Sequence, residues 1–189
     1  MSTWLVAVVW VVWFLVVSGT GYARSRSLDR VDRQATTASV RADVIMLLAL
    51  AGGVAAAVML PAAALPWDRW VTDVAGMLLV AAGLAVRQWA AVTLGDFFTR
   101  SVAIRDRQRV VTAGPYRYVR HPAYAGMLLS VVGLALTLGS WLSILIIVVG
   151  CLLANVSRIR AEESVLTASL GDEYQAYAHT RKRLIPGVW

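Results

Sequence analysis

Five long apolar runs constrain this chain more than any other feature of its sequence. A helix that crosses the hydrocarbon core of a bilayer, about 30 Å thick, needs about 20 mostly apolar residues. The apolar runs cover residues 3–21, 44–65, 71–94, 123–138 and 141–156. Because apolar runs of this kind are typical of membrane spans, we predict an all-α integral membrane protein of about five transmembrane helices.

The composition supports this fold class. Hydrophobic residues make up 59% of the 189 residues, and charged residues make up 15%. A soluble domain has about 45–50% and about 25% respectively. The first run lacks the basic segment and the small-residue cleavage site of a signal peptide, so we expect it to remain as a helix.

The boundaries of the last three runs predict how their helices end. Runs four and five have 16 residues each and are joined by Gly139–Ser140. They are therefore predicted to form a helical hairpin, in which the fifth helix continues beyond the membrane into residues 157–170. Run three carries Arg87 and Gln88 near its end, where we expect the long side chain to extend to the membrane interface.

Basic residues are concentrated in three segments, and this asymmetry predicts the orientation of the chain. Segments 22–43, 95–122 and 157–189 hold five, six and five Lys or Arg residues, whereas the other two connections hold only Arg69. Positive residues favour the cytoplasmic side of a membrane. We therefore expect the N-terminus outside and the C-terminus in the cytoplasm, which agrees with an odd number of spans.

The net charge of +7 does not indicate a nucleic-acid partner. The basic residues lie in the connections between spans and do not alternate with a platform of stacking aromatic side chains. The single cysteine, Cys151, lies in an apolar run without a Cys or His at metal-ligand spacing. We therefore expect a packing role for Cys151, membrane lipids as partners, and neither nucleic acid nor metal.

Segment 110–126 is the first polar patch that suits a ligand. Gly114–Pro115 predicts a turn, and Pro122 is expected to open the fourth helix at its first position. A helix N-terminus favours anions, and this one is flanked by Arg120 and His121. The patch therefore suits a carboxylate-bearing ligand, although arginine, histidine and tyrosine are also ordinary anchors at a membrane interface.

The end of the fifth helix is the second polar patch. Helical spacing places four of its residues on one face, namely Cys151, Asn155, Arg158 and Glu162. One interpretation is an ordinary ion pair between Arg158 and Glu162, worth about 0.3–0.5 kcal/mol if exposed. The other is a ligand site, because the adjacent carboxylates Glu162 and Glu163 suit a ligand with positive charge and hydroxyl groups. S-adenosylmethionine has a sulfonium, an ammonium and a ribose diol.

Four motifs occur in order in the C-terminal half of the chain: VVTAGPYRYVRHPAYAG, RIRAEESVL, GDEYQAY and RLIP. They contain the patterns G-x-Y, RHPxY and RxxxEE. With these motifs, about residues 84–189 resemble the isoprenylcysteine carboxyl methyltransferase family, within a wider group that includes phospholipid methyltransferases. One position departs from the pattern, since Gln108 stands where the family often has a histidine.

The resemblance implies a site for S-adenosylmethionine. The residues that would form it are Gln108, Val110, Val111, Tyr116, His121, Pro122, Ala123, Tyr124, Glu162 and Glu163. Glu162 would hold the polar groups of the cofactor, with Glu163 as a second acid. Arg158 matches the family position that faces the methyl acceptor. Residues 71–189 would then form a methyltransferase core, preceded in residues 1–70 by two helices and a basic cytoplasmic loop.

The function that the resemblance implies is methyl transfer from S-adenosylmethionine to an amphiphilic acceptor, prenyl-cysteine-like or lipid, at its carboxylate. A carboxylate needs no general base, and Arg158 would orient it through paired hydrogen bonds. Two alternatives stay open: a membrane reductase that uses a nicotinamide cofactor, and a non-enzymatic membrane scaffold. One Lys against 17 Arg hints at a GC-rich genome, so we expect a bacterial inner membrane with the site facing the cytoplasm.

Overall fold

The computed structural model describes residues 10, 13, 30–31, 33–98, 103–104, 109–187 and 189. Most of them belong to four long helices, α2 (Arg33–Met59), α3 (Arg69–Leu94), α4 (Pro122–Thr137) and α5 (Trp141–Thr180). Short 3-10 helices follow α2, follow α3 and precede α4, namely η1 (Pro61–Ala63), η2 (Gly95–Phe97) and η3 (Gly114–Arg117). An antiparallel pair of two-residue strands, which the sequence did not predict, joins β1 (Arg30–Val31) and β2 (Ala103–Ile104). Apart from this pair, the all-helical fold class is confirmed for the described residues.

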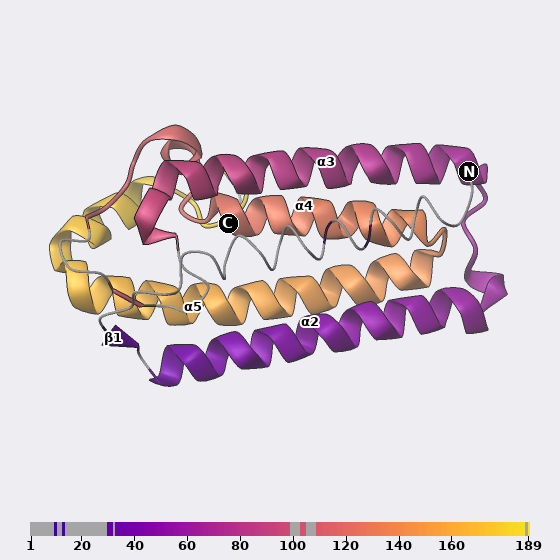
Figure 1. Cartoon of the computed structure of the whole chain (residues 1–189), viewed down its shortest axis with the longest axis horizontal. Helices are drawn as coiled ribbons and strands as arrows, with labels where there is room; N and C mark the ends of the chain where they lie inside the picture. The colour runs from indigo at the N-terminus through magenta and orange to yellow at the C-terminus, as the bar shows by residue number, and fades with distance from the viewer. Residues whose placement is uncertain are drawn as a thin grey trace.

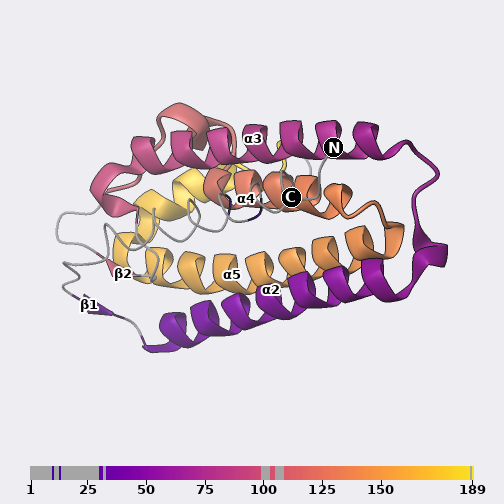
Figure 2. The same ribbon diagram turned by 45° about the vertical axis from the view of Figure 1, so that its right-hand side comes forward.

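The four long helices lie side by side along the long axis of the molecule, and consecutive helices run in opposite directions (Figures 1 and 2). α3 packs along α4, α2 packs along α5, and α4 also contacts α5. One end of this bundle, at the left of Figure 1, holds residues 95–98, 109–121 and 160–187. We refer to it as the site end, because it contains both polar patches of the sequence.

Three of the helical segments are long and apolar enough to cross a membrane: Thr37–Met59, Arg69–Phe97 and Trp141–Thr180. α4 is apolar but shorter, with 16 residues. Large hydrophobic side chains are exposed on these helices, for example Leu47, Leu48, Val58, Leu78, Val92 and Leu153. Such surfaces suit contact with lipid chains, so the chain is an integral membrane protein. The first apolar run lies outside the described residues except for Trp10 and Trp13, and the count of five spans stays a prediction.

Most helix bounds agree with the apolar runs, but α2 begins earlier than its run. α3 and α4 start within two residues of positions 71 and 123. α2 starts at Arg33, whereas its run starts at position 44. Hydropathy marks only the apolar part of a helix, so it misses a helix that extends into polar sequence. As predicted, α4 and α5 form a hairpin and α5 continues past position 156, with a kink at Gly171 (φ 53°, ψ −129°).

Small residues let α3 and α4 pack closely. A methyl group on Gly83 would lie 2.5 Å from the carbonyl oxygen of Gly126, and one on Gly76 would lie 2.7 Å from that of Gly133. Within each helix the two glycines are seven residues apart, about two turns, so both contacts fall on one stripe of each helix. Interfaces of this kind are common between membrane helices, where small residues allow backbones to approach.

The core lies between the helix pairs. Among its fully buried residues are Val131, Leu134, Ile147 and Cys151. The packing role predicted for Cys151 is therefore confirmed. Two tryptophans from the first apolar run donate to α4, since Trp13 Nε1 lies 2.8 Å from Ser130 Oγ and Trp10 Nε1 lies 3.3 Å from Thr137 Oγ1.

Candidate active site at the site end

The turn before α4 packs against the end of α3. Gly114 adopts a positive φ of 55°, and a methyl group there would lie 2.7 Å from Thr93 Oγ1. Only glycine therefore meets both requirements at this position. Pro122 is the first residue of α4, as predicted, and Pro122 and Ala123 are both buried. His121 then takes the N-cap position without capping the helix through its side chain, and this side chain is directed to α5.

Glu163 is the centre of an ion-pair cluster. Its Oε1 forms an ion pair with Arg120 Nη1 at 2.8 Å and lies 3.1 Å from His121 Nε2. Its Oε2 accepts from Arg183 Nε at 3.0 Å and from Arg183 Nη2 at 2.8 Å. Because the protein already supplies partners to both oxygens, little hydrogen-bonding capacity remains for a ligand. The part predicted for Glu163 in cofactor binding stays a prediction, and this geometry does not favour it.

The C-terminal tail crosses the same cluster. The backbone N–H groups of Arg120 and His121 donate to the carbonyl oxygens of Lys182 and Arg183, at 2.8 and 3.0 Å. Leu184 follows and is only 3% exposed. We term residues 181–187 the tail strap, because they fasten the turn before α4 through backbone hydrogen bonds, an ion pair and a buried leucine.

Tyr116 anchors the turn from inside. Its carbonyl oxygen accepts from the Tyr177 hydroxyl at 2.7 Å. Its ring packs in a buried cluster with Ala91 and Phe98. Burial raises the pKa of the Tyr116 phenol, with the Glu162 carboxylate as a further cause. The hydroxyl therefore stays protonated at neutral pH and can act as a hydrogen-bond donor.

Arg87 corrects an expectation from the sequence. We expected it to reach the membrane interface, but it is buried, with 9% exposure. Its guanidinium carbon lies 5.5 Å from the ring centroid of Phe98, and its charge acts on Tyr116. The prediction was wrong because Phe98, beyond the end of α3, packs against the guanidinium, and periodicity within one helix cannot reveal such a tertiary contact. Gln88 is exposed.

Glu162 has a more open environment than Glu163. Its carboxylate lies 3.8 Å from His121 Nδ1, and its side chain is 29% exposed. Tyr124 interacts with both Glu162 and Arg158, and its ring lies 5.7 Å from that of His121. The guanidinium carbon of Arg158 lies 5.9 Å from the Tyr124 ring centroid. The structure thus brings together four predicted residues from α4, its N-cap and α5.

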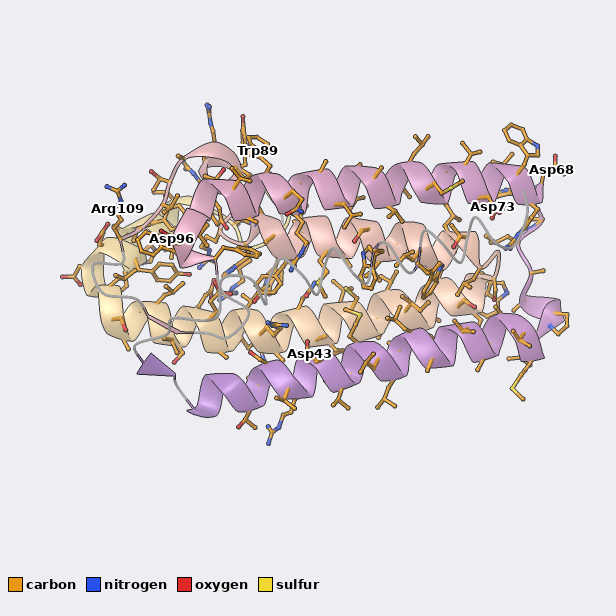
Figure 3. All side chains as sticks on the ribbon, viewed as in Figure 1. Asp43, Asp68, Asp73, Trp89, Asp96 and Arg109 are labelled. Atoms are coloured by element: carbon orange, nitrogen blue, oxygen red, sulfur yellow. The ribbon has the colours of Figure 1, made fainter. Side chains whose placement is uncertain are left out.

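Arg158 has a second carboxylate beside it, which the sequence did not single out. Arg158 Nη1 donates to Asp43 Oδ1 at 3.2 Å. Figure 3 shows Asp43 on the side of α2 that faces α5. A surface pair with Glu162 alone therefore describes Arg158 incompletely. The sequence does carry a signal for Asp43, because a carboxylate at the edge of an apolar run usually has a partner in the protein.

The last predicted residues lie beside the turn. The Val110 N–H donates to Glu173 Oε1 at 3.2 Å. Val111 is partly buried and packs against the cluster of Tyr116. Gln108 lies outside the described residues, so its contact with the cofactor stays a prediction. Within the described part of the chain, no group of three or more His, Cys, Asp or Glu side chains is arranged to hold a metal ion.

The fold and the site define a class: an integral membrane helical protein with a polar site, rich in arginine, tyrosine and glutamate, at one end of the bundle. A sequence model of the isoprenylcysteine carboxyl methyltransferase (ICMT) family matches residues 74–168. The chain belongs to this family. The matched part includes η3, α4 and the stretch of α5 with Arg158, Glu162 and Glu163, whereas Asp43 and the tail strap lie outside it.

Individual relatives agree with this assignment. A probable protein-S-isoprenylcysteine O-methyltransferase of Oryza sativa is 34% identical over 113 residues, which are 59% of this chain and 59% of the rice protein. Protein-S-isoprenylcysteine O-methyltransferase B of Arabidopsis thaliana is 30% identical over 76% of this chain and 72% of its own length.

A solved structure of the eukaryotic intramembrane Ras methyltransferase ICMT superposes with a TM-score of 0.61 at 25% identity. The superposed region covers 82% of this chain and 53% of that protein. The chain thus spans only about half of the solved relative and 59% of the rice proteins.

Proposed function

We propose that this chain is an S-adenosylmethionine-dependent methyltransferase that methylates the carboxylate of an amphiphilic, prenyl-cysteine-like or lipid, acceptor. The observation that carries the proposal is the convergence of His121, Tyr124, Arg158 and Glu162 at one end of a membrane bundle of this family. The names of the relatives support methyl transfer to a carboxyl group.

The residues at the site end fit the proposed cofactor. Glu162 is 29% exposed, lies 3.8 Å from His121 Nδ1 and also interacts with Tyr124, so its carboxylate keeps acceptor capacity for an ammonium or a ribose hydroxyl. One turn below Arg158, the buried side-chain oxygen of Asn155 has no hydrogen-bond partner among the described residues, and it offers a further acceptor. When bound, S-adenosylmethionine supplies a methyl group bonded to its sulfonium sulfur. An acceptor carboxylate oxygen would form a bond to the methyl carbon while the carbon–sulfur bond breaks and leaves its electrons on sulfur.

The chain itself would mainly position the cofactor and the acceptor and exclude water from them. Glu162, with Tyr124 and His121 beside it, would hold the cofactor, and buried Tyr116 of η3, which packs against α3, would close the site on that side. Arg158 would orient the acceptor carboxylate with its planar fork of donors. Because a carboxylate is already ionised, no side chain has to accept a proton, and the rate depends on alignment of the two reactants.

The remaining proposals concern the orientation of the chain in the membrane and its division into domains. The arginine distribution supports a cytoplasmic site end, five spans and opposite termini, and the composition supports a bacterial inner membrane. Residues 71–189 remain the proposed methyltransferase core, and residues 1–70 the preceding pair of helices. α2 packs along α5, so this first part also supports the site.

Equilibrium binding of labelled S-adenosylmethionine to the purified chain tests the proposal. We expect saturable binding, and methyl ester formation when N-acetyl-S-farnesylcysteine is added. Labelled NADPH, measured in parallel, tests the reductase alternative, and a scaffold would bind neither. Binding of NADPH without response to S-adenosylmethionine would contradict the proposed function.

A further inference from the structure

Asp43 is a carboxylate within an apolar helical segment, Thr37–Met59. Ionisable side chains in membrane helices are costly, and they usually face the protein and pair there. Asp43 follows this pattern. It lies on the side of α2 that faces α5 (Figure 3), next to buried Ala42, while Val40 and Val44 are exposed. Its side chain is 39% exposed, so Asp43 lies at the edge of the apolar segment, with its carboxylate paired to Arg158.

Asp43 pairs with the arginine that the proposed function assigns to the acceptor. The distance from Arg158 Nη1 to Asp43 Oδ1 is 3.2 Å, and the arginine side chain is 13% exposed. The contact joins residues 115 positions apart, from α2, outside the family match at 74–168, and α5, inside it. A guanidinium carries five donors in one plane. The contact of one terminal nitrogen with the Asp43 carboxylate therefore helps to fix the orientation of that plane.

We propose that Asp43 is a positioning residue, which holds the Arg158 guanidinium in the orientation that receives the acceptor carboxylate. The proposal rests on the proposed function. The Tyr124 ring, 5.9 Å from the guanidinium carbon, limits movement on the α4 side, and Asp43 limits it on the α2 side. Arg158 is thus held from two helices. Loss of one support misaligns the acceptor, which lowers the rate more than the affinity.

The first test separates positioning from general stability. In the purified full chain, Asp43→Asn is expected to lower kcat for N-acetyl-S-farnesylcysteine by about tenfold or more. Affinity for S-adenosylmethionine should stay within about twofold. Because Asp43 acts through Arg158, Asp43→Asn should cause no further loss of kcat in an Arg158→Lys background, since effects within one unit are not additive. Asp68→Asn, the same charge change at an exposed position at the opposite end of α3 (Figure 3), serves as control and should leave kcat unchanged.

Three results would overturn the inference: an unchanged kcat in Asp43→Asn, an additive loss in the double variant, or a rise in kcat. A rise would mean that Asp43 competes with the acceptor for Arg158.

The second test does not depend on activity. With arginine labelled by nitrogen-15, the Arg158 side-chain signal is identified by its absence in Arg158→Lys. We expect slow rotation of its terminal nitrogens in the wild type and faster averaging in Asp43→Asn. An Arg158 signal that Asp43→Asn leaves unchanged overturns the inference whatever the activity. If the signal changes but the wild type forms no methyl ester, Asp43 does position Arg158, and the proposed function is the part that fails.

Discussion

At the residue scale, the adjacent acids Glu162 and Glu163 have different surroundings. Glu163 is paired with Arg120, His121 and Arg183, and its side chain is 12% exposed. Glu162 is 29% exposed, with His121 Nδ1 at 3.8 Å. Successive residues of a helix point about 100° apart, so neighbours in sequence can have separate roles. We therefore propose that Glu162 binds the cofactor and that Glu163 stabilises the tail strap.

Substitution of each acid tests this division. Glu162→Gln should weaken binding of S-adenosylmethionine by about 1.5–3 kcal/mol, the worth of a charge-assisted hydrogen bond, and leave the melting temperature nearly unchanged. Glu163→Gln should lower the melting temperature by about 2–10 °C, because Arg120 and Arg183 lose their anionic partner. Titration calorimetry and thermal unfolding measure the two effects. Equal losses of affinity at unchanged stability would contradict the division.

At the element scale, the tail strap is held mainly by its contacts with the turn before α4. Arg183→Gln removes the contact with Glu163 and should make the C-terminus more sensitive to limited proteolysis. Arg181→Gln is a matched control, because exposed Arg181 donates only to its neighbour's carbonyl oxygen among the bonds described, that of Thr180 at 2.9 Å. It should be cleaved at the wild-type rate. Equal rates in both variants would show that the ion pair does not hold the strap.

The interface of α3 and α4 allows a second test at this scale. Gly83→Ala places a methyl group 2.5 Å from the Gly126 carbonyl oxygen, so the helices must move apart, at a cost of about 1–3 kcal/mol. Gly52→Ala on α2 is the control, because the nearest atom to its methyl group, from Ile146, lies at 3.5 Å. It should be neutral or gain up to about 1 kcal/mol from helix propensity. Thermal unfolding in detergent compares the two, and a stable Gly83→Ala would refute the close packing.

At the scale of the whole molecule, the orientation in the membrane is predicted from the 16 basic residues of segments 22–43, 95–122 and 157–189. A reporter fused after Trp189 should be cytoplasmic, and one placed before Met1 should lie outside, because positive segments stay on the cytoplasmic side. Reporter activity on each side of the membrane measures this directly. A C-terminal reporter found outside would reverse the orientation and remove the site end from a cytoplasmic pool of cofactor.

The sequence by itself determined the parts of this protein that depend on local physics. Apolar run length predicted α3, α4 and the first part of α5, because a lipid-facing helix must be apolar along its whole span. Pro122 predicted the first residue of α4, since proline fits the first turn of a helix. The motifs also indicated the protein family. No apolar run by itself indicated how the helices pack.

Only the tertiary structure decided which charges meet. Arg158 meets Asp43 from a position 115 residues away, and Arg183 meets Glu163 through a tail that returns to the turn before α4. The burial of Arg87 and the early start of α2 were likewise outside the reach of hydropathy. The same physical reason applies to all these charged residues. The partner of a side chain depends on how the packed helices are rotated and offset relative to one another. Close contacts such as that of Gly83 with Gly126 determine this arrangement. A periodic pattern within one helix carries no information about its neighbour.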